Sequence, residues 1–125
     1  MTTQPNVELL HDTLAHIEAN PDRWYQRDYR CRSGMCYAGL TCELAGGRWI
    51  YPEPLNSAGD DWLVPEPGDE RVSTTPAGLR YVTPHNRAKR LLGLTNDQAY
   101  VLFDAANIVD DLRRIVDGIC AGAVS

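Results

Sequence analysis

The stretch TPHNRAKRLLGLTNDQAYVLF, residues 83–103, contains the start and stop signals of two consecutive helices. Thr83 and Pro84 read as an N-cap followed by a proline at the first helical position, and Gly93 supplies a left-handed stop. The string TNDQ that follows is a capping box, in which the threonine and the glutamine satisfy each other's backbone donors. We therefore predict one helix that ends at Gly93 and a second helix that begins at the capping box.

Apolar residues recur at helical spacing in other parts of the chain. Residues 7–17 form one apolar face with Asn6 as its N-cap, and a proline beyond this face stops the helix. Residues 34–45 form a second predicted helix that Ser33 caps, and residues 108–119 continue at helical spacing towards the end of the chain. The side chains expected in the core are Leu10, Leu14, Ile17, Leu40, Leu44, Leu91, Leu92, Leu102, Phe103, Leu112 and Ile115.

These patterns predict a mainly α fold, with α+β as the alternative. We expect a single small helical domain over residues 1–125, with at most a short two-stranded β-hairpin formed by 48–51 and 79–82. Between these strands, residues 52–78 form an extended acidic loop or insertion with five of the eight prolines. A loop this long inside a compact domain is usually a functional or disordered insertion. Its one apolar spot, residues 62–64, either packs on the body of the domain or stays exposed as an anchor.

The composition is 43% hydrophobic and 23% charged, which is ordinary for a globular domain. Twelve Lys and Arg oppose 17 Asp and Glu for a net charge of −5, and segment 52–78 accounts for this whole excess. An acidic chain repels phosphate, so a large basic footprint for nucleic acid is absent. No apolar run reaches the ~18–20 residues of a membrane span, and the N-terminal pattern is not that of a secretory signal. We therefore expect a cytoplasmic protein whose four cysteines are reduced thiols.

Arginines alternate with aromatic residues between the first two predicted helices. Such residues are enriched at protein-binding hot spots, and they can also stack on bases and pair with phosphate. We rank ordinary structural packing first, protein binding second and nucleic-acid binding third. The candidate protein-binding residues are Arg23, Trp24, Tyr25, Arg27, Tyr29 and Arg30, together with Trp62 in the acidic segment.

The two helices within 84–103 are similar to the helix-turn-helix pattern of bacterial regulators, because a short glycine turn lets two helices cross steeply. The second helix of such a motif presents basic and amide groups to the major groove. Here it carries Asp97 and no Lys or Arg. We prefer an ordinary helical hairpin and keep a nucleic-acid-binding regulator as the alternative. In that alternative, Arg87, Lys89 and Arg90 would contact phosphate.

Patterns for catalysis and for metal binding are weak. Cys36 falls in the first turn of the helix predicted at 34–45, where the helix dipole favours a thiolate, and His85 is its one candidate base. A buried structural cysteine is more common, so we expect Cys36 to be mostly buried. Cys31, Cys36 and Cys42 lack the close pair that is typical of zinc sites. We therefore expect no catalytic residue, no cofactor and no metal.

Two segments carry a resemblance to a known group of proteins. CYAGLTCELAGG (36–47) and HNRAKRLLGLTNDQAYVLFDAAN (85–107) resemble small proteins of actinobacteria and their phages that have no assigned activity. The shared pattern is a C-x-A-G helix and a segment in which LLGL is followed by QA and then by LF, and it covers roughly 35 of the 125 residues. The resemblance implies a phage gene product that acts in the cytoplasm of its host, and it carries over no catalytic residue.

The function we expect is that of a non-enzymatic interaction protein, which binds a host or phage protein in the cytoplasm. Self-association is a further option. A helix-turn-helix-like regulator that uses helices 84–103 is the alternative, and an enzyme that depends on Cys36 ranks third.

Overall fold

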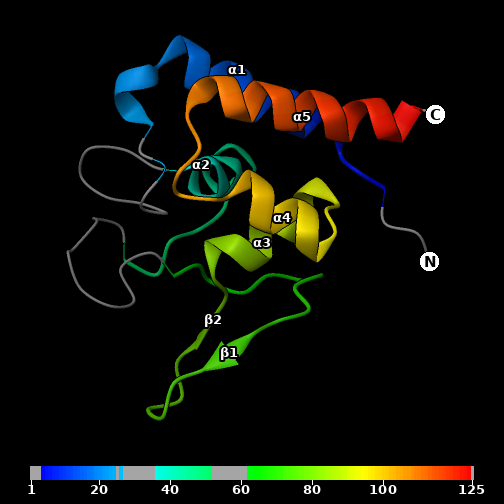
Figure 1. Cartoon of the computed structure of the whole chain (residues 1–125). Coiled ribbons are helices and arrows are strands. Elements are labelled where there is room, and N and C mark those ends of the chain that lie inside the picture. Colours follow the sequence, from blue (N-terminus) through cyan, green and yellow to red (C-terminus); the bar gives the residue numbers. More distant parts are fainter. Residues whose placement is uncertain (1–3, 25, 27–35, 52–61, 125) are drawn as a thin grey trace.

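The computed structural model describes residues 4–24, 26, 36–51 and 62–124, and for 123 and 124 it describes the backbone alone. These residues form five α-helices, one 3-10 helix and a two-stranded antiparallel sheet, so the predicted mainly α fold is confirmed (Figure 1). The elements are α1 (Val7–Ala19), η1 (Pro21–Arg23), α2 (Tyr37–Leu44), β1 (Ser73–Thr74), β2 (Arg80–Tyr81), α3 (Pro84–Leu92), α4 (Asn96–Leu102) and α5 (Val109–Val124).

The helices surround one cluster of buried apolar side chains. Helix α1 packs against α5 and α2, α2 packs against α3, and α4 packs against α5 and α3 (Figure 1). The cluster includes most of the predicted core, and Tyr37 joins it fully buried, with its hydroxyl donating to the carbonyl of Leu10 at 2.5 Å. Phe103 and Ile115 pack against this core as half-buried side chains. Helix α2 thus contacts both α1 and α3, and these two helices also contact each other.

The predicted start and stop signals are confirmed in α1, α3 and α4. Asn6 and Thr83 accept backbone N–H groups at the N-termini of α1 and α3, and Thr95 with Gln98 forms the capping box of α4. Gly93 is left-handed, with φ +66°, and a Cβ atom there would collide with the carbonyl oxygen of Gln4. Two features therefore require glycine at position 93: the left-handed backbone conformation and the close approach of the N-terminal segment.

Three local predictions about helices need correction. Helix α2 begins at Tyr37, and its N-cap is Cys36, whose sulfur accepts the Gly39 N–H at 3.5 Å; the predicted cap, Ser33, lies outside the described residues. Leu44 is 43% exposed because it is the last residue of α2, beyond the part of that helix that the core covers. Leu91 is half-buried rather than buried.

The predicted pairing of 48–51 with 79–82 is wrong, because Leu63 lies between the two segments. Leu63 forms antiparallel bridges with Trp49 on one side and with Val82 on the other. Its N–H donates to the Val82 carbonyl at 2.9 Å, and the Val82 N–H donates back at 3.1 Å. Leu63 is fully buried, so the apolar spot at 62–64 packs on the body of the protein. The short sheet is formed further along, where Ser73 pairs with Tyr81 and Thr74 with Arg80.

We expect Leu63→Ala to lower the free energy of unfolding by about 2–5 kcal/mol, because the truncation leaves a cavity in a fully buried position. The matched control is Leu79→Ala, since Leu79 is 39% exposed, and its cost should stay below about 1 kcal/mol. Urea unfolding of both variants measures this difference. Equal costs would show that residue 63 does not anchor the acidic segment in the core.

Candidate functional site

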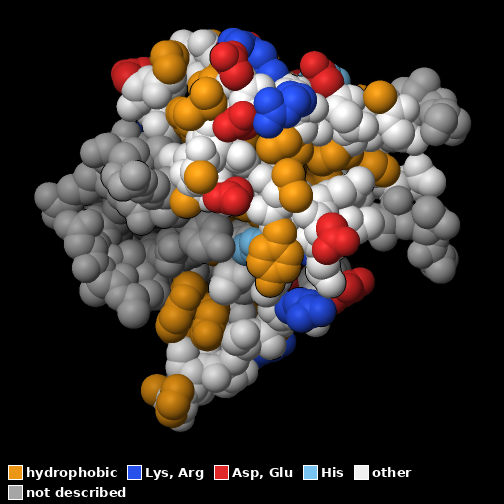
Figure 2. All heavy atoms as spheres, viewed as in Figure 1, with side chains coloured by type: hydrophobic (Ala, Val, Ile, Leu, Met, Phe, Trp, Pro, Cys, Tyr) orange, Lys and Arg blue, Asp and Glu red, His pale blue; other side chains and the backbone are white. Residues whose placement is uncertain are grey.

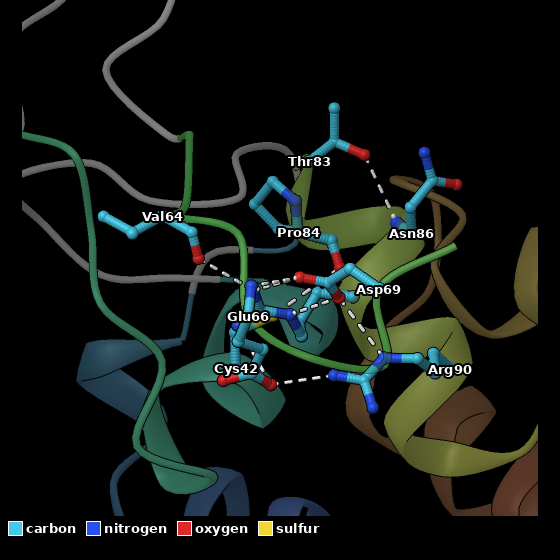
Figure 3. A network of polar contacts seen from close by, with 9 residues as sticks. Cys42, Val64, Glu66, Asp69, Thr83, Pro84, Asn86 and Arg90 are labelled. Carbon is cyan, nitrogen blue, oxygen red and sulfur yellow. Dashed lines mark hydrogen bonds and ion pairs between the residues drawn. The ribbon is translucent and has the colours of Figure 1, made fainter. Parts of the chain in front are cut away.

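Four charged side chains join the acidic segment to helix α3, and we call Glu66, Asp69, Arg87 and Arg90 the ion-pair cluster (Figure 3). The side chains of Arg87 and Asp69 are each 1% exposed. Arg87 donates from Nε to Oδ1 of Asp69 at 2.9 Å and from Nη2 to Oδ2 at 2.6 Å. Its Nη2 also donates to the Val64 carbonyl at 2.9 Å. This bidentate geometry is the strongest form of an arginine–carboxylate contact.

Arg90 completes the cluster from the next turn of α3. Its Nη2 donates to Glu66 Oε1 at 2.7 Å, and its Nε donates to Asp69 Oδ1 at 3.2 Å. A tight turn positions both acids, since the Asp69 N–H donates to the Glu66 carbonyl at 3.1 Å and Gly68 has a φ of +100°. Pro67 and Gly68 are the residue types that such a turn favours at its centre. The local sequence PEPGDE therefore brings two carboxylates to α3.

The contact between Asp69 and Arg87 favours the ionised form of both side chains in the folded state. Burial acts to raise the pKa of Asp69, but the hydrogen bonds from Arg87 and the Glu66 backbone outweigh it, so this pKa lies below its usual value. Burial likewise acts to lower the pKa of Arg87, and the hydrogen bond and charge of Asp69 outweigh it and raise that pKa. Both groups are therefore ionised at neutral pH, and each neutralises the other.

The candidate nucleic-acid residues on α3 differ in their surroundings. Arg87 and Arg90 are held by the ion-pair cluster, while Lys89 is half-buried and forms no ion pair with any residue that the structure describes. Helix α4, the second helix of the hairpin, exposes Tyr100 and Val101 rather than basic groups. Of the three candidate residues, only Lys89 is therefore left without an ion-pair partner among the described residues and could contact phosphate.

The arginine–aromatic candidates fall only partly within the described residues. Arg23 is exposed at the end of η1, and Trp24 is half-buried with its Nε1 donating to Oε1 of Gln26 at 2.9 Å. Gln26 is buried and ties this segment to the backbone of Leu102 and Asp104 through its side-chain amide. The candidates Tyr25, Arg27, Tyr29 and Arg30 lie outside the described residues.

Trp62, the candidate in the acidic segment, stacks on Tyr81. The two ring centroids lie 3.8 Å apart and the ring planes are 11° from parallel. Trp62 is half-buried, so part of its ring stays accessible beside the short sheet.

The sequence did not lead us to expect exposed hydrophobic side chains on α4 and at Ile108, the residue before α5. Tyr100 is 71% exposed, Val101 53% and Ile108 59%. We call these three residues the Tyr100 surface. Figure 2 shows hydrophobic side chains on the face that carries α4, with acidic side chains beside them. The signal was present in the sequence, because Tyr100 and Val101 fall off the helical face that Ala99 and Leu102 define.

The described cysteines, Cys36, Cys42 and Cys120, are all buried. Cys36 is 3% exposed, as expected, and sits at the N-cap of α2. Cys42 is fully buried and donates to the Pro84 carbonyl at 3.6 Å, and burial raises its pKa far above the usual range.

Burial and the charge of Lys89 lower the pKa of His85, so this ring is neutral at pH 7. The described residues contain no group of three or more His, Cys, Asp or Glu placed to hold a metal ion.

Comparison with family models, with curated proteins and with solved structures gave no match for this chain. Within the described residues, none of the helices has both the length and the apolar character that a membrane span requires.

We expect Asp69→Asn to lower the free energy of unfolding at pH 7 by about 3 kcal/mol, because it removes the buried carboxylate that pairs with Arg87 and leaves only the longer contact to the more exposed Glu66. The folded pKa of Asp69 is depressed, so its contribution is complete above the unfolded value of about 3.9 and is lost progressively as the pH falls from there through the lower folded pKa. The difference between the wild type and the variant should therefore shrink below about pH 4.

Thermal unfolding of both proteins between pH 7 and pH 2.5 measures this dependence. Asp117→Asn is the control, since Asp117 is exposed on α5 and forms no ion pair among the described residues. A constant gap between wild type and Asp69→Asn at every pH would show that the carboxylate charge does not hold the segment in place.

Proposed function

We propose that this chain is a non-enzymatic interaction protein that binds another protein, a host protein or a phage protein, through the Tyr100 surface. The observation that carries the proposal is the exposure of Tyr100, Val101 and Ile108, three large hydrophobic side chains close together in the sequence. Singly exposed hydrophobics are ordinary on a protein surface, and the proposal is that these three act together.

The backbone beneath this surface is well fixed. The side-chain amide of Asn107 donates to the carbonyls of Val101 and Leu102, at 2.8 and 3.1 Å, and so closes the connection between α4 and α5. The N–H of Ile108 donates to Oδ2 of Asp111 at 3.0 Å. A rigid presentation of apolar side chains reduces the entropy lost on binding.

Aromatic neighbours extend the surface around Tyr100. The ring of His85 lies 5.7 Å from that of Tyr100 and 5.3 Å from that of Phe103, measured between centroids. Because the His85 ring is neutral at pH 7, it adds no charge to this group. Tyrosine is among the residues that dominate binding energy at interfaces, since its ring buries a large area and its hydroxyl can still hydrogen-bond.

Acidic side chains near this surface define the chemistry of the partner. The exposed residues Asp97 and Asp104 lie on α4 and just after it, and neither forms an ion pair within the part of the chain that the structure describes. A complementary partner would present apolar side chains flanked by lysine or arginine. This same acidity disfavours the alternative, a regulator that places α4 in the major groove of DNA.

We expect Tyr100→Ala to weaken binding to the partner by about 30-fold, which corresponds to the loss of a hot-spot residue. The measurement is affinity capture from host lysate with the full chain as bait, followed by titration of the enriched protein. Leu79→Ala is the matched control, because Leu79 is an exposed hydrophobic residue outside the Tyr100 surface and its loss should leave the affinity unchanged. Repeated capture without an enriched protein, or equal binding by both variants, would contradict the proposal.

A further inference from the structure

A small pocket of about 210 Å³ lies between residues 69–71 and helix α3. From α3 it is lined by Asn86, by Lys89 three residues later and by Arg90 four residues later, so each of the two cations lies beside Asn86 on the helix surface. Arg71 and Glu70 line it from the loop. The pocket is smaller than the roughly 300–1,000 Å³ of sites for drug-sized molecules, so it fits one compact chemical group.

The polar groups in this pocket divide into two sets. Arg90 is committed, because its Nε and Nη2 already donate to Asp69 and Glu66. The side chains of Arg71, Asn86 and Lys89 make no hydrogen bond or ion pair with any part of the chain that the structure describes. Lys89 is the only lysine in the sequence. Two cations and a side-chain amide thus line one small pocket with their donors unused.

The charges that remain favour an anion. Within the ion-pair cluster, two arginines and two carboxylates cancel. Outside it, Arg71 and Lys89 oppose the single carboxylate of Glu70, which leaves the pocket positive in a chain whose net charge is −5. An oxyanion would accept hydrogen bonds from both cations, and such charge-assisted bonds are stronger than neutral ones.

We propose that this pocket binds a compact oxyanion, a phosphate or carboxylate group, through Arg71, Asn86 and Lys89. The site goes beyond the proposed function, because it uses none of the residues of the Tyr100 surface. The ion-pair cluster gives the site its shape: Asp69 fixes the loop that carries Arg71 and holds Arg90 back from the ligand. The Glu70 carboxylate opposes binding, so its neutralisation should strengthen the site.

The test is an NMR titration of the full chain with inorganic phosphate at constant ionic strength, with sodium acetate as a second arm. We expect saturable shifts of the Gly93 and Leu94 amide signals, which lie in the pocket wall, with a dissociation constant in the millimolar range. Stronger binding of phosphate would assign the site to phosphoryl groups, and stronger binding of acetate would assign it to carboxylates.

Substitutions of the charged residues that line the pocket test whether the anion binds there. Arg71→Met and Lys89→Met should each weaken anion binding by about tenfold, and Glu70→Gln should strengthen it several-fold. Arg80→Met is the matched control, since it makes the same charge change at an exposed position on β2 and should leave the affinity unchanged. Shifts that grow linearly with both anions, or a loss in Arg80→Met equal to that in Arg71→Met, would overturn the proposal. Unchanged thermal stability of the methionine variants confirms that the comparison is between folded proteins.

Discussion

The rest of the structure depends on the buried pair of Arg87 and Asp69. Arg87 projects from α3 into a region that water does not reach, and its charge would cost several kcal/mol there without a partner. Asp69 supplies that partner from a segment about 20 residues earlier in the chain. The pair therefore holds this segment against α3, next to the bridges by which Leu63 joins Trp49 and Val82.

This constraint also divides the charged surface into committed and uncommitted groups. The arginines that the helix-turn-helix hypothesis assigns to phosphate are occupied by Glu66 and Asp69, while Lys89 and Arg71 keep their donors unused around a small pocket. What α4 exposes is apolar and acidic, which is the chemistry of a surface for a protein with a basic rim.

Local signals in the sequence were enough to predict α1, α3 and α4. Asn6, Thr83 and the capping box at Thr95 act within a few residues, so their effect can be read without knowledge of the fold. The insertion of Leu63 and the partner of Arg87 depend on contacts about 20 residues apart, and no periodic pattern reports such contacts. A single clue was available: an acidic segment precedes a basic helix. The exposure of Tyr100 was also readable, as a residue off the apolar face of its helix.

A double-mutant cycle on Arg87 and Asp69 tests most directly whether this pair holds the acidic segment in place. The free energies of unfolding of Arg87→Met, Asp69→Leu and the double variant are measured by urea denaturation at pH 7. If the pair acts as described, each single variant is strongly destabilised, the double variant recovers part of the loss, and the coupling free energy is at least about 2 kcal/mol. Additive losses, with a coupling near zero, would contradict this central role of the pair.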